Sequence, residues 1–165
     1  MGRILTITLI LLLCICLLGC TQETNMGKPV QFYYRNADIS FESSSTVILS
    51  ETRDCEGLES HVQCLQLYLQ GPSSDRLVSP FPDGLQLRSV HMEGQDLIVV
   101  MSEELAQLSG LELMIACGCI ASTCMELTGA QRIVIRAENE RLDGKYEIIL
   151  DKDSLLLLDT SLPKE

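Results

Sequence analysis

The residues best suited to chemistry in this chain are its cysteines, of which there are eight. Thiols bind soft metals, form disulfides, or act as nucleophiles once deprotonated. Three lie within the first twenty residues, and five lie in the rest of the chain: Cys55, Cys64, Cys117, Cys119 and Cys124. Five is an odd number, so at least one of these thiols has no disulfide partner within a single chain.

Three roles remain open for these five cysteines: buried apolar side chains, one disulfide, or a metal or redox centre. The Cys-Gly-Cys sequence at 117–119 lacks the ligand spacing and the second ligand pair of a structural zinc site. Cys117 and Cys124 fall on the apolar stripe of a predicted helix, whereas Cys119 is expected on its more polar side. Cys55 and Cys64 are nine residues apart, and they can bridge only if Cys55 lies in a loop before the helix that carries Cys64.

Other residue types give no catalytic or cation-binding pattern. His61 and His91 lack an acid–base partner motif, and His61 is expected to pack beside a helix. The serine runs 43–45 and 73–74 lack the Gly-x-Ser-x-Gly setting of a serine nucleophile. The segment 151–154 begins like a calcium loop without its glycine and closing glutamate, so a hairpin turn is expected there. We therefore expect no enzyme activity, no cofactor and no metal.

The charge of the chain argues against nucleic acid as a partner. The net charge is −11 at pH 7, and all 23 acidic residues follow residue 20. Such a field repels nucleic acid and anionic lipid head groups. Tryptophan is absent and aromatic residues make up only 4% of the chain, so few aromatic rings are present on which bases or sugars could stack.

The first twenty residues have the pattern of a lipoprotein signal peptide. Arg3 precedes the apolar run 4–18, which as a helix is about 22 Å long and therefore shorter than the ~30 Å hydrocarbon core of a bilayer. The run ends in Leu17-Leu18-Gly19-Cys20, which looks like a bacterial lipobox. We expect cleavage of residues 1–19 between Gly19 and Cys20, and attachment of a diacylglyceryl group to the Cys20 thiol. An uncleaved signal anchor and a plain secreted protein are the alternatives. Residues 20–28 then form a polar tether.

The periodicity of the remaining chain predicts an α+β domain. Strands are expected at 30–34, 46–50, 85–92, 97–101, 132–137 and 146–150, and the last pairs with 155–158 in a C-terminal hairpin. A change of phase within 85–92 predicts a bulge near Ser89. Helices are expected at 58–70, with Leu58, Val62, Leu65 and Leu69 inward, and at 111–127, with Leu113, Cys117, Ile120, Cys124 and Leu127 inward. A short helical piece is expected at 103–108 after an N-cap at Ser102, and 73–83 is expected to be a loop. We expect two layers, with two helices covering one mixed sheet of about four to six strands.

This order of elements resembles the GerM domain, a module of bacterial sporulation and germination lipoproteins. The resemblance rests on the aromatic strand 30–34, the helix end at 69–72, the Pro82-Asp83-Gly84 turn, the strand end at 99–102, and segment 123–129 leading into 133–135. It implies a GerM-like domain at 29–144, extended by a hairpin and tail at 145–165. Bacillus-type members carry two such domains, and this chain has room for one.

From the resemblance and the signal peptide we expect a lipid-anchored, extracytoplasmic assembly module of the cell envelope, linked to sporulation or germination. Its partners are the membrane, through Cys20, and envelope or sporulation proteins; the homo-oligomeric state stays open. Sheet edges at the first strand, with Phe32, Tyr33 and Tyr34, or at the C-terminal hairpin are the expected docking sites. The alternative is a lipoprotein that binds a small ligand or cell-wall fragment or modulates a wall hydrolase, with a pocket beside Tyr33, Tyr34 and His91.

Overall fold

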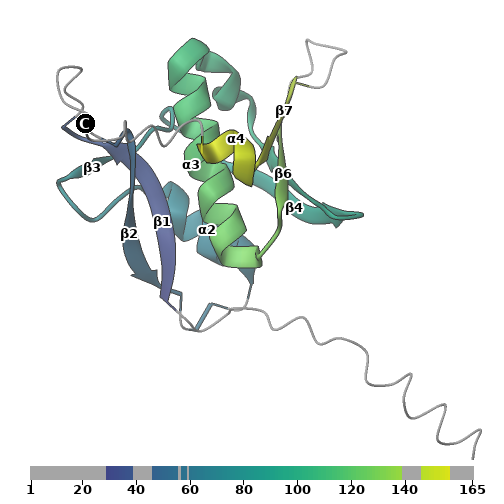
Figure 1. Cartoon of the computed structure of the whole chain (residues 1–165), viewed down its shortest axis with the longest axis horizontal. Helices are drawn as coiled ribbons and strands as arrows, with labels where there is room; N and C mark the ends of the chain where they lie inside the picture. The colour runs from purple at the N-terminus through teal and green to yellow at the C-terminus, as the bar shows by residue number, and fades with distance from the viewer. Residues whose placement is uncertain (1–28, 39–45, 56, 59, 139–145, 157–165) are drawn as a thin grey trace, which may run out of the picture.

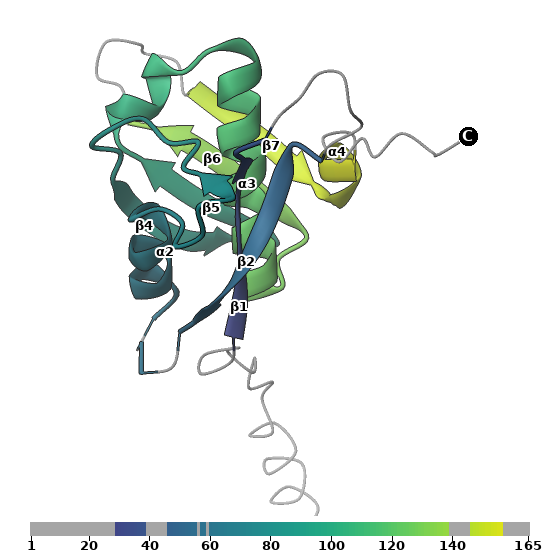
Figure 2. The ribbon, with the colours of Figure 1, turned by 90° about the vertical axis from the view of Figure 1, so that its left-hand side faces the viewer.

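The computed structural model describes residues 29–38, 46–55, 57–58, 60–138 and 146–156. The signal peptide, Gly19, Cys20 and the tether expected at 20–28 lie outside the described residues. The α+β class predicted from the sequence is confirmed, and the strands are divided between two sheets rather than gathered in one. Figures 1 and 2 show the two sheets on either side of the longest helix.

The first sheet has three strands in the order β2-β1-β3, all antiparallel. The predicted first strand is confirmed as β1 (Pro29–Asn36), and the second is β2 (Ile48–Asp54), which extends further along the chain than predicted. Alternate residues of β1 face the core, so its aromatic side chains at positions 32 and 34 are fully buried. The third strand, β3 (Leu77–Val78), lies within the predicted loop 73–83; two residues are too few to show a periodic pattern.

The second sheet has four strands in the order β4-β5-β6-β7. These are β4 (Leu87–Glu93), β5 (Asp96–Met101), β6 (Arg132–Ala137) and β7 (Tyr146–Asp151). β4 and β5 form a hairpin whose turn contains Gly94 at φ 67°, a backbone conformation that favours glycine. The bulge expected near Ser89 is confirmed by a register shift between Leu87 and Ser89. β5 and β6 are parallel, so the chain must cross over between them.

The crossover is made by α3 (Gly110–Thr128), which lies between the two sheets (Figures 1 and 2). All five residues of its predicted stripe are buried, and the rest of its circumference is largely buried as well. Cys119 was expected on a polar side and is fully buried, because the three-stranded sheet covers that side of the helix: Thr123, one turn further along, bonds to β1. The helix is long and apolar enough to cross a membrane by length and composition, but 67% of its apolar window is buried. Its hydrophobicity is therefore that of a core helix.

The helix α2 (His61–Leu69) begins three residues later than predicted. Of its predicted stripe, Leu65 is buried, and Leu58 and Leu69 are partly buried against the core. Its buried residues are Cys64, Leu65 and Tyr68, whereas Val62 is exposed on 36% of its surface. Ser60 caps its N-terminus by accepting a hydrogen bond from the Gln63 backbone N–H at 3.3 Å. The predicted inward stripe of this helix was wrong in Val62, because two overlapping apolar spacings exist in the segment.

Two shorter helices complete the described chain. The predicted helical piece after β5 is confirmed as the 3₁₀ helix η1 (Glu103–Gln107), although the Ser102 hydroxyl accepts a hydrogen bond from the Gln86 N–H at 2.9 Å instead of capping it. After β7 the chain forms α4 (Lys152–Leu156), so the predicted hairpin turn and the predicted strand were wrong at 151–156; residues 157–158 lie outside the described residues. The Asp151 carboxylate accepts hydrogen bonds from the Ser154 N–H at 2.8 Å and its hydroxyl at 2.7 Å, which starts a helix at this point.

Candidate interaction surface

The aromatic residues of β1 form a buried cluster with α2. Tyr34 donates its hydroxyl hydrogen to the Tyr68 carbonyl at 2.8 Å, and Tyr68 donates its own to the Tyr33 carbonyl at 2.8 Å. The rings of Phe32 and Phe81 each meet the Tyr68 ring edge-on, with centroids 5.2 Å apart in both pairs. Burial raises the pKa of Tyr68 well above its usual value, so its phenol remains a hydrogen-bond donor.

This cluster corrects the predicted partner-binding residues. Phe32 and Tyr34 have no exposed surface, and Tyr33 is half-buried. β1 is also not a free edge: it pairs with strands on both sides, and the Tyr33 N–H donates to the Thr123 hydroxyl of α3 at 3.0 Å. The pocket expected beside Tyr33, Tyr34 and His91 is not formed, because Tyr34 is buried and His91 is exposed on the other sheet.

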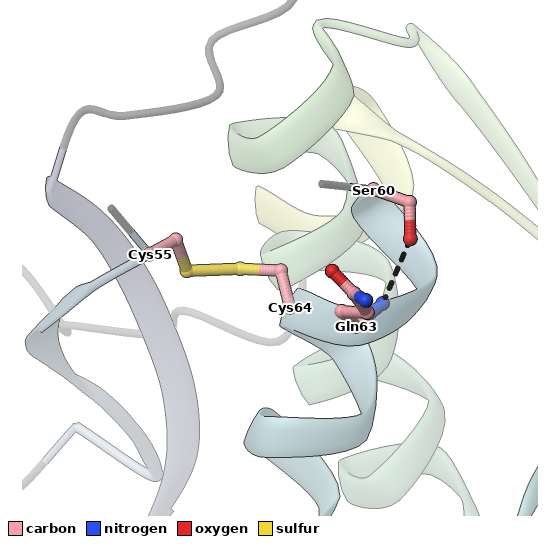
Figure 3. Close-up of a disulfide and its surroundings, with 4 residues drawn as sticks. All are labelled: Cys55, Ser60, Gln63 and Cys64. Carbon is pink, nitrogen blue, oxygen red and sulfur yellow. Dashed lines mark hydrogen bonds between the residues drawn. A yellow bond between two sulfur atoms is a disulfide. The ribbon is translucent and has the colours of Figure 1, made fainter. Parts of the chain in front are cut away.

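A disulfide between Cys55 and Cys64 joins the end of β2 to α2, and both residues are buried (Figure 3). Their Cα atoms are 6.0 Å apart, within the usual range for a disulfide. The bond forms because Cys55 lies in the loop before α2, which is the condition identified from the spacing. Among the alternatives left open for the five cysteines, this pair is the disulfide and the other three are free buried thiols.

We expect the double substitution of Cys55 and Cys64 by serine to lower the free energy of unfolding by about 2–3 kcal/mol, because a bond across nine residues restricts the unfolded chain. Urea unfolding followed by circular dichroism measures the change. The wild-type protein treated with a reductant is the matched control and should lose the same amount; equal stability of the oxidised, reduced and substituted forms would contradict this role.

The three free thiols lie on α3 and are poorly suited to chemistry. Burial raises the pKa of Cys117 and Cys124 to about 12 each, and it raises that of Cys119 as well. A nucleophilic or metal-binding cysteine must lose its proton, which burial opposes. Within the described residues, no group of three or more His, Cys, Asp or Glu side chains is arranged to hold a metal ion.

Histidines occupy two different settings. His61, at the start of α2, is half-buried, and burial lowers its pKa, so it packs as a neutral ring. His91 is exposed on β4, where its Nε2 lies 3.1 Å from a Glu93 carboxylate oxygen. The same Glu93 carboxylate oxygen lies 3.1 Å from Arg136, so His91 belongs to an exposed network of charged side chains.

Glu51 of β2 holds the loop that follows α2. Its side chain is only 10% exposed and accepts hydrogen bonds from the Ser73 N–H at 3.0 Å, the Ser73 hydroxyl at 3.0 Å, the Ser74 N–H at 3.1 Å and Arg53 at 2.7 Å. Burial alone would raise the pKa of Glu51, but the hydrogen bonds from Ser73 and Arg53 bring it below its usual value. Arg53 also donates to the Gly71 carbonyl at 2.9 Å, so the loop is fixed at several points.

Replacing Glu51 with glutamine should destabilise the protein at pH 7 by about 1.5–3 kcal/mol, because hydrogen bonds to a charged acceptor are lost. Because the pKa of Glu51 is lower in the folded state than in the unfolded state, its ionised form stabilises the fold at any pH above the unfolded-state pKa. This stabilisation is lost as the pH falls through the folded-state pKa. The stability difference between wild type and Glu51→Gln should therefore shrink below about pH 4.5. Urea unfolding at pH 7, 5 and 3 measures it; a difference that is constant over this range would contradict the assignment.

The outer face of the four-stranded sheet, meaning the face turned away from α3, carries a network of ion pairs. Arg136 of β6 contacts Glu93 of β4 at 3.1 Å and Glu147 of β7 at 2.9 Å, so it spans the sheet. Arg132 forms a two-point contact with Asp96. Between these pairs runs one row of residues in register across the strands: His91, Ile98, Val134 and Ile149. Ile98 and Val134 are buried, whereas Ile149 is 53% exposed.

Comparison with known proteins identifies the family. The profile of the family described as Germane, sporulation and spore germination, matches residues 31–143. Among solved structures, the 2.5 Å crystal structure of a candidate lipoprotein from Clostridium perfringens is similar, with 19% identity, a TM-score of 0.46, and coverage of 82% of this chain and 95% of that chain. No curated protein matches the sequence. The family match extends over more than half of the chain and confirms the GerM resemblance, so this chain belongs to the Germane family of sporulation and spore germination proteins.

Proposed function

We propose that this chain is a non-catalytic assembly module, held on the outer side of the cytoplasmic membrane by a lipid on Cys20, in complexes of sporulation or spore germination. The observation that carries the proposal is the Germane match over residues 31–143, directly behind a sequence that looks like a lipobox. The burial of the free thiols supports a non-catalytic role, since their chemistry is suppressed.

The surface proposed for docking is the β7 edge of the four-stranded sheet. Within the described residues β7 pairs only with β6, so its other edge has backbone groups free to accept a partner strand. The opposite edge strand, β4, packs against α2, and β7 itself packs against α3 and α4 while its outer backbone edge pairs with no described strand. Ile149 adds an exposed apolar side chain beside the β7 edge, and the acidic chain favours a partner whose docking strand is flanked by basic residues.

Substituting Ile149 with lysine tests this docking surface. The side chain is half exposed, so the fold should keep its stability within about 0.5 kcal/mol while an apolar contact is replaced by a charge. In a strain lacking the wild-type gene, Ile149→Lys should reduce recovery of co-purified envelope proteins and formation or germination of spores by about tenfold.

The matched control is Val62→Lys, which places the same charge on an exposed site of α2 away from β7. It should behave as wild type in both assays. If both variants support normal spores with the same co-purified proteins, β7 is not the docking edge.

A further inference from the structure

The three half-buried arginines of the described chain have different surroundings. Arg53 pairs with Glu51 at 2.7 Å, and Arg136 pairs with Glu147 at 2.9 Å and with Glu93. The side chain of Arg35, near the end of β1, has no hydrogen-bond or ion-pair partner among the described residues, and its Nε is fully buried. A buried N–H group without a partner is uncommon in folded proteins, and the guanidinium of Arg35 also has no counter-ion among the described residues.

Arg35 lines a cavity of about 210 Å³ at the junction of β1, the loop after β3 and the start of α3. Its walls are about equally polar and apolar, and the apolar part is formed by Pro80, Phe81, Pro82, Leu108 and Ile115. Glu112, in the first turn of α3, lies at the exposed side of the same cavity. The volume is smaller than that of drug-sized sites and is suited to a ligand the size of one amino-acid residue.

The walls of this cavity are fixed in position before any ligand binds. The Phe81 ring packs edge-on against Tyr68 with centroids 5.2 Å apart, and its N–H donates to the Ser79 hydroxyl at 3.3 Å. Prolines on both sides of Phe81 restrict the backbone. The Glu51 contacts fix the loop leading to β3. A cavity with rigid walls binds without first having to order a loop.

We propose that this cavity binds an α-carboxylate beside an apolar side chain, as found in a free amino acid or in the C-terminal residue of a peptide. The guanidinium of Arg35 binds the carboxylate, since guanidinium and carboxylate match in geometry and carry opposite charges. The proline, phenylalanine, leucine and isoleucine walls cover the apolar side chain. Glu112 receives the N–H or ammonium group carried by the same α-carbon. The inference goes beyond the assembly role and does not depend on the lipid at Cys20.

Calorimetric titration of the complete protein, extracted in a mild non-ionic detergent, tests the site. N-acetyl-L-leucine should bind with a Kd on the order of 1 mM, and its amide, which lacks the carboxylate charge, about tenfold more weakly. Arg35→Gln should weaken binding of the acid about tenfold. Arg76→Gln is the matched control, because it removes the same charge from an exposed residue outside the cavity. This variant should bind N-acetyl-L-leucine within about twofold of the wild-type affinity.

Free L-leucine distinguishes the two sources of the carboxylate. Tighter binding of free leucine than of its N-acetyl form would indicate an amino acid, and the reverse order would indicate the end of a peptide. The proposal is overturned if the acid does not bind at about 20 mM, if the acid and the amide bind equally, or if Arg35→Gln binds as well as Arg76→Gln. Should Arg35→Gln fail to fold, the comparison of acid with amide on the wild-type protein decides the question.

Discussion

Replacing Tyr68 with alanine is expected to lower the free energy of unfolding by about 3–5 kcal/mol, enough to unfold much of a protein of ordinary stability. The side chain is 1% exposed and packs against three aromatic rings, those of Phe32, Tyr34 and Phe81. Its removal leaves a cavity at the junction of the three-stranded sheet and α2. It also leaves the Tyr33 carbonyl without the hydroxyl that satisfies it.

Two further variants separate the contributions to this effect. Tyr68→Phe keeps the ring and removes the hydroxyl that bonds to the Tyr33 carbonyl and to the Thr123 side chain, so it should cost about 1–2 kcal/mol. Val62→Ala, on the exposed side of the same helix, should cost less than about 0.5 kcal/mol. Urea unfolding followed by far-ultraviolet circular dichroism gives all three values. A larger loss for Val62→Ala than for Tyr68→Ala would contradict the orientation of α2 in the structure.

The orientation of α2 shows where sequence reasoning was insufficient. Its segment contains apolar residues at several overlapping helical spacings, so a stripe through Val62 and Leu69 fits the periodicity as well as one through Cys64 and Tyr68. Long-range contacts determine which residues are buried. The disulfide from Cys55 holds Cys64 in the core, and the aromatic residues of β1 pack against Tyr68. Neither contact is visible in the local pattern of the helix.

Elements with a strong local pattern were predicted well. The strand at 132–137 is found with the predicted bounds, and α3 extends one residue beyond its predicted bounds at each end. The prediction failed for Cys119 because a periodic stripe indicates one buried face and cannot show that a second sheet covers the other. For the same reason, the periodicity could not show that the strands are divided between two sheets.

The candidate binding residues depended even more on tertiary structure. Phe32 and Tyr34 were considered as surface contacts, yet alternate residues of a half-buried strand face the core, and the largest apolar ones occupy it. Glu51 and Arg35 gave no signal in the sequence. Glu51 acts on Ser73, twenty-two residues away, and Arg35 is distinguished only by the absence of a partner among the described residues.

Removing the Cys20 thiol is expected to abolish lipid attachment. Two acyl chains contribute on the order of 20 kcal/mol to membrane association, so no surface contact of this acidic chain could replace them. Cys20→Ser removes the sulfur to which the diacylglyceryl group is attached, and with it the cleavage expected after Gly19. Uncleaved residues 1–19 could still hold the variant at a membrane, so the lipid itself must be measured, not membrane association alone.

Intact-mass spectrometry of the protein extracted from cells grown with an alkyne-bearing palmitate analogue tests the account most directly. The wild-type chain should begin at Cys20 and carry two or more acyl chains, about nine tenths of it in the membrane fraction. Cys16→Ser, which alters a thiol of the predicted leader, is the matched control and should give the same product. Cys20→Ser should carry no label and keep its leader. A wild-type chain found without acyl groups in the cytosol, or a Cys20→Ser variant labelled as strongly as wild type, would contradict a lipid-anchored module.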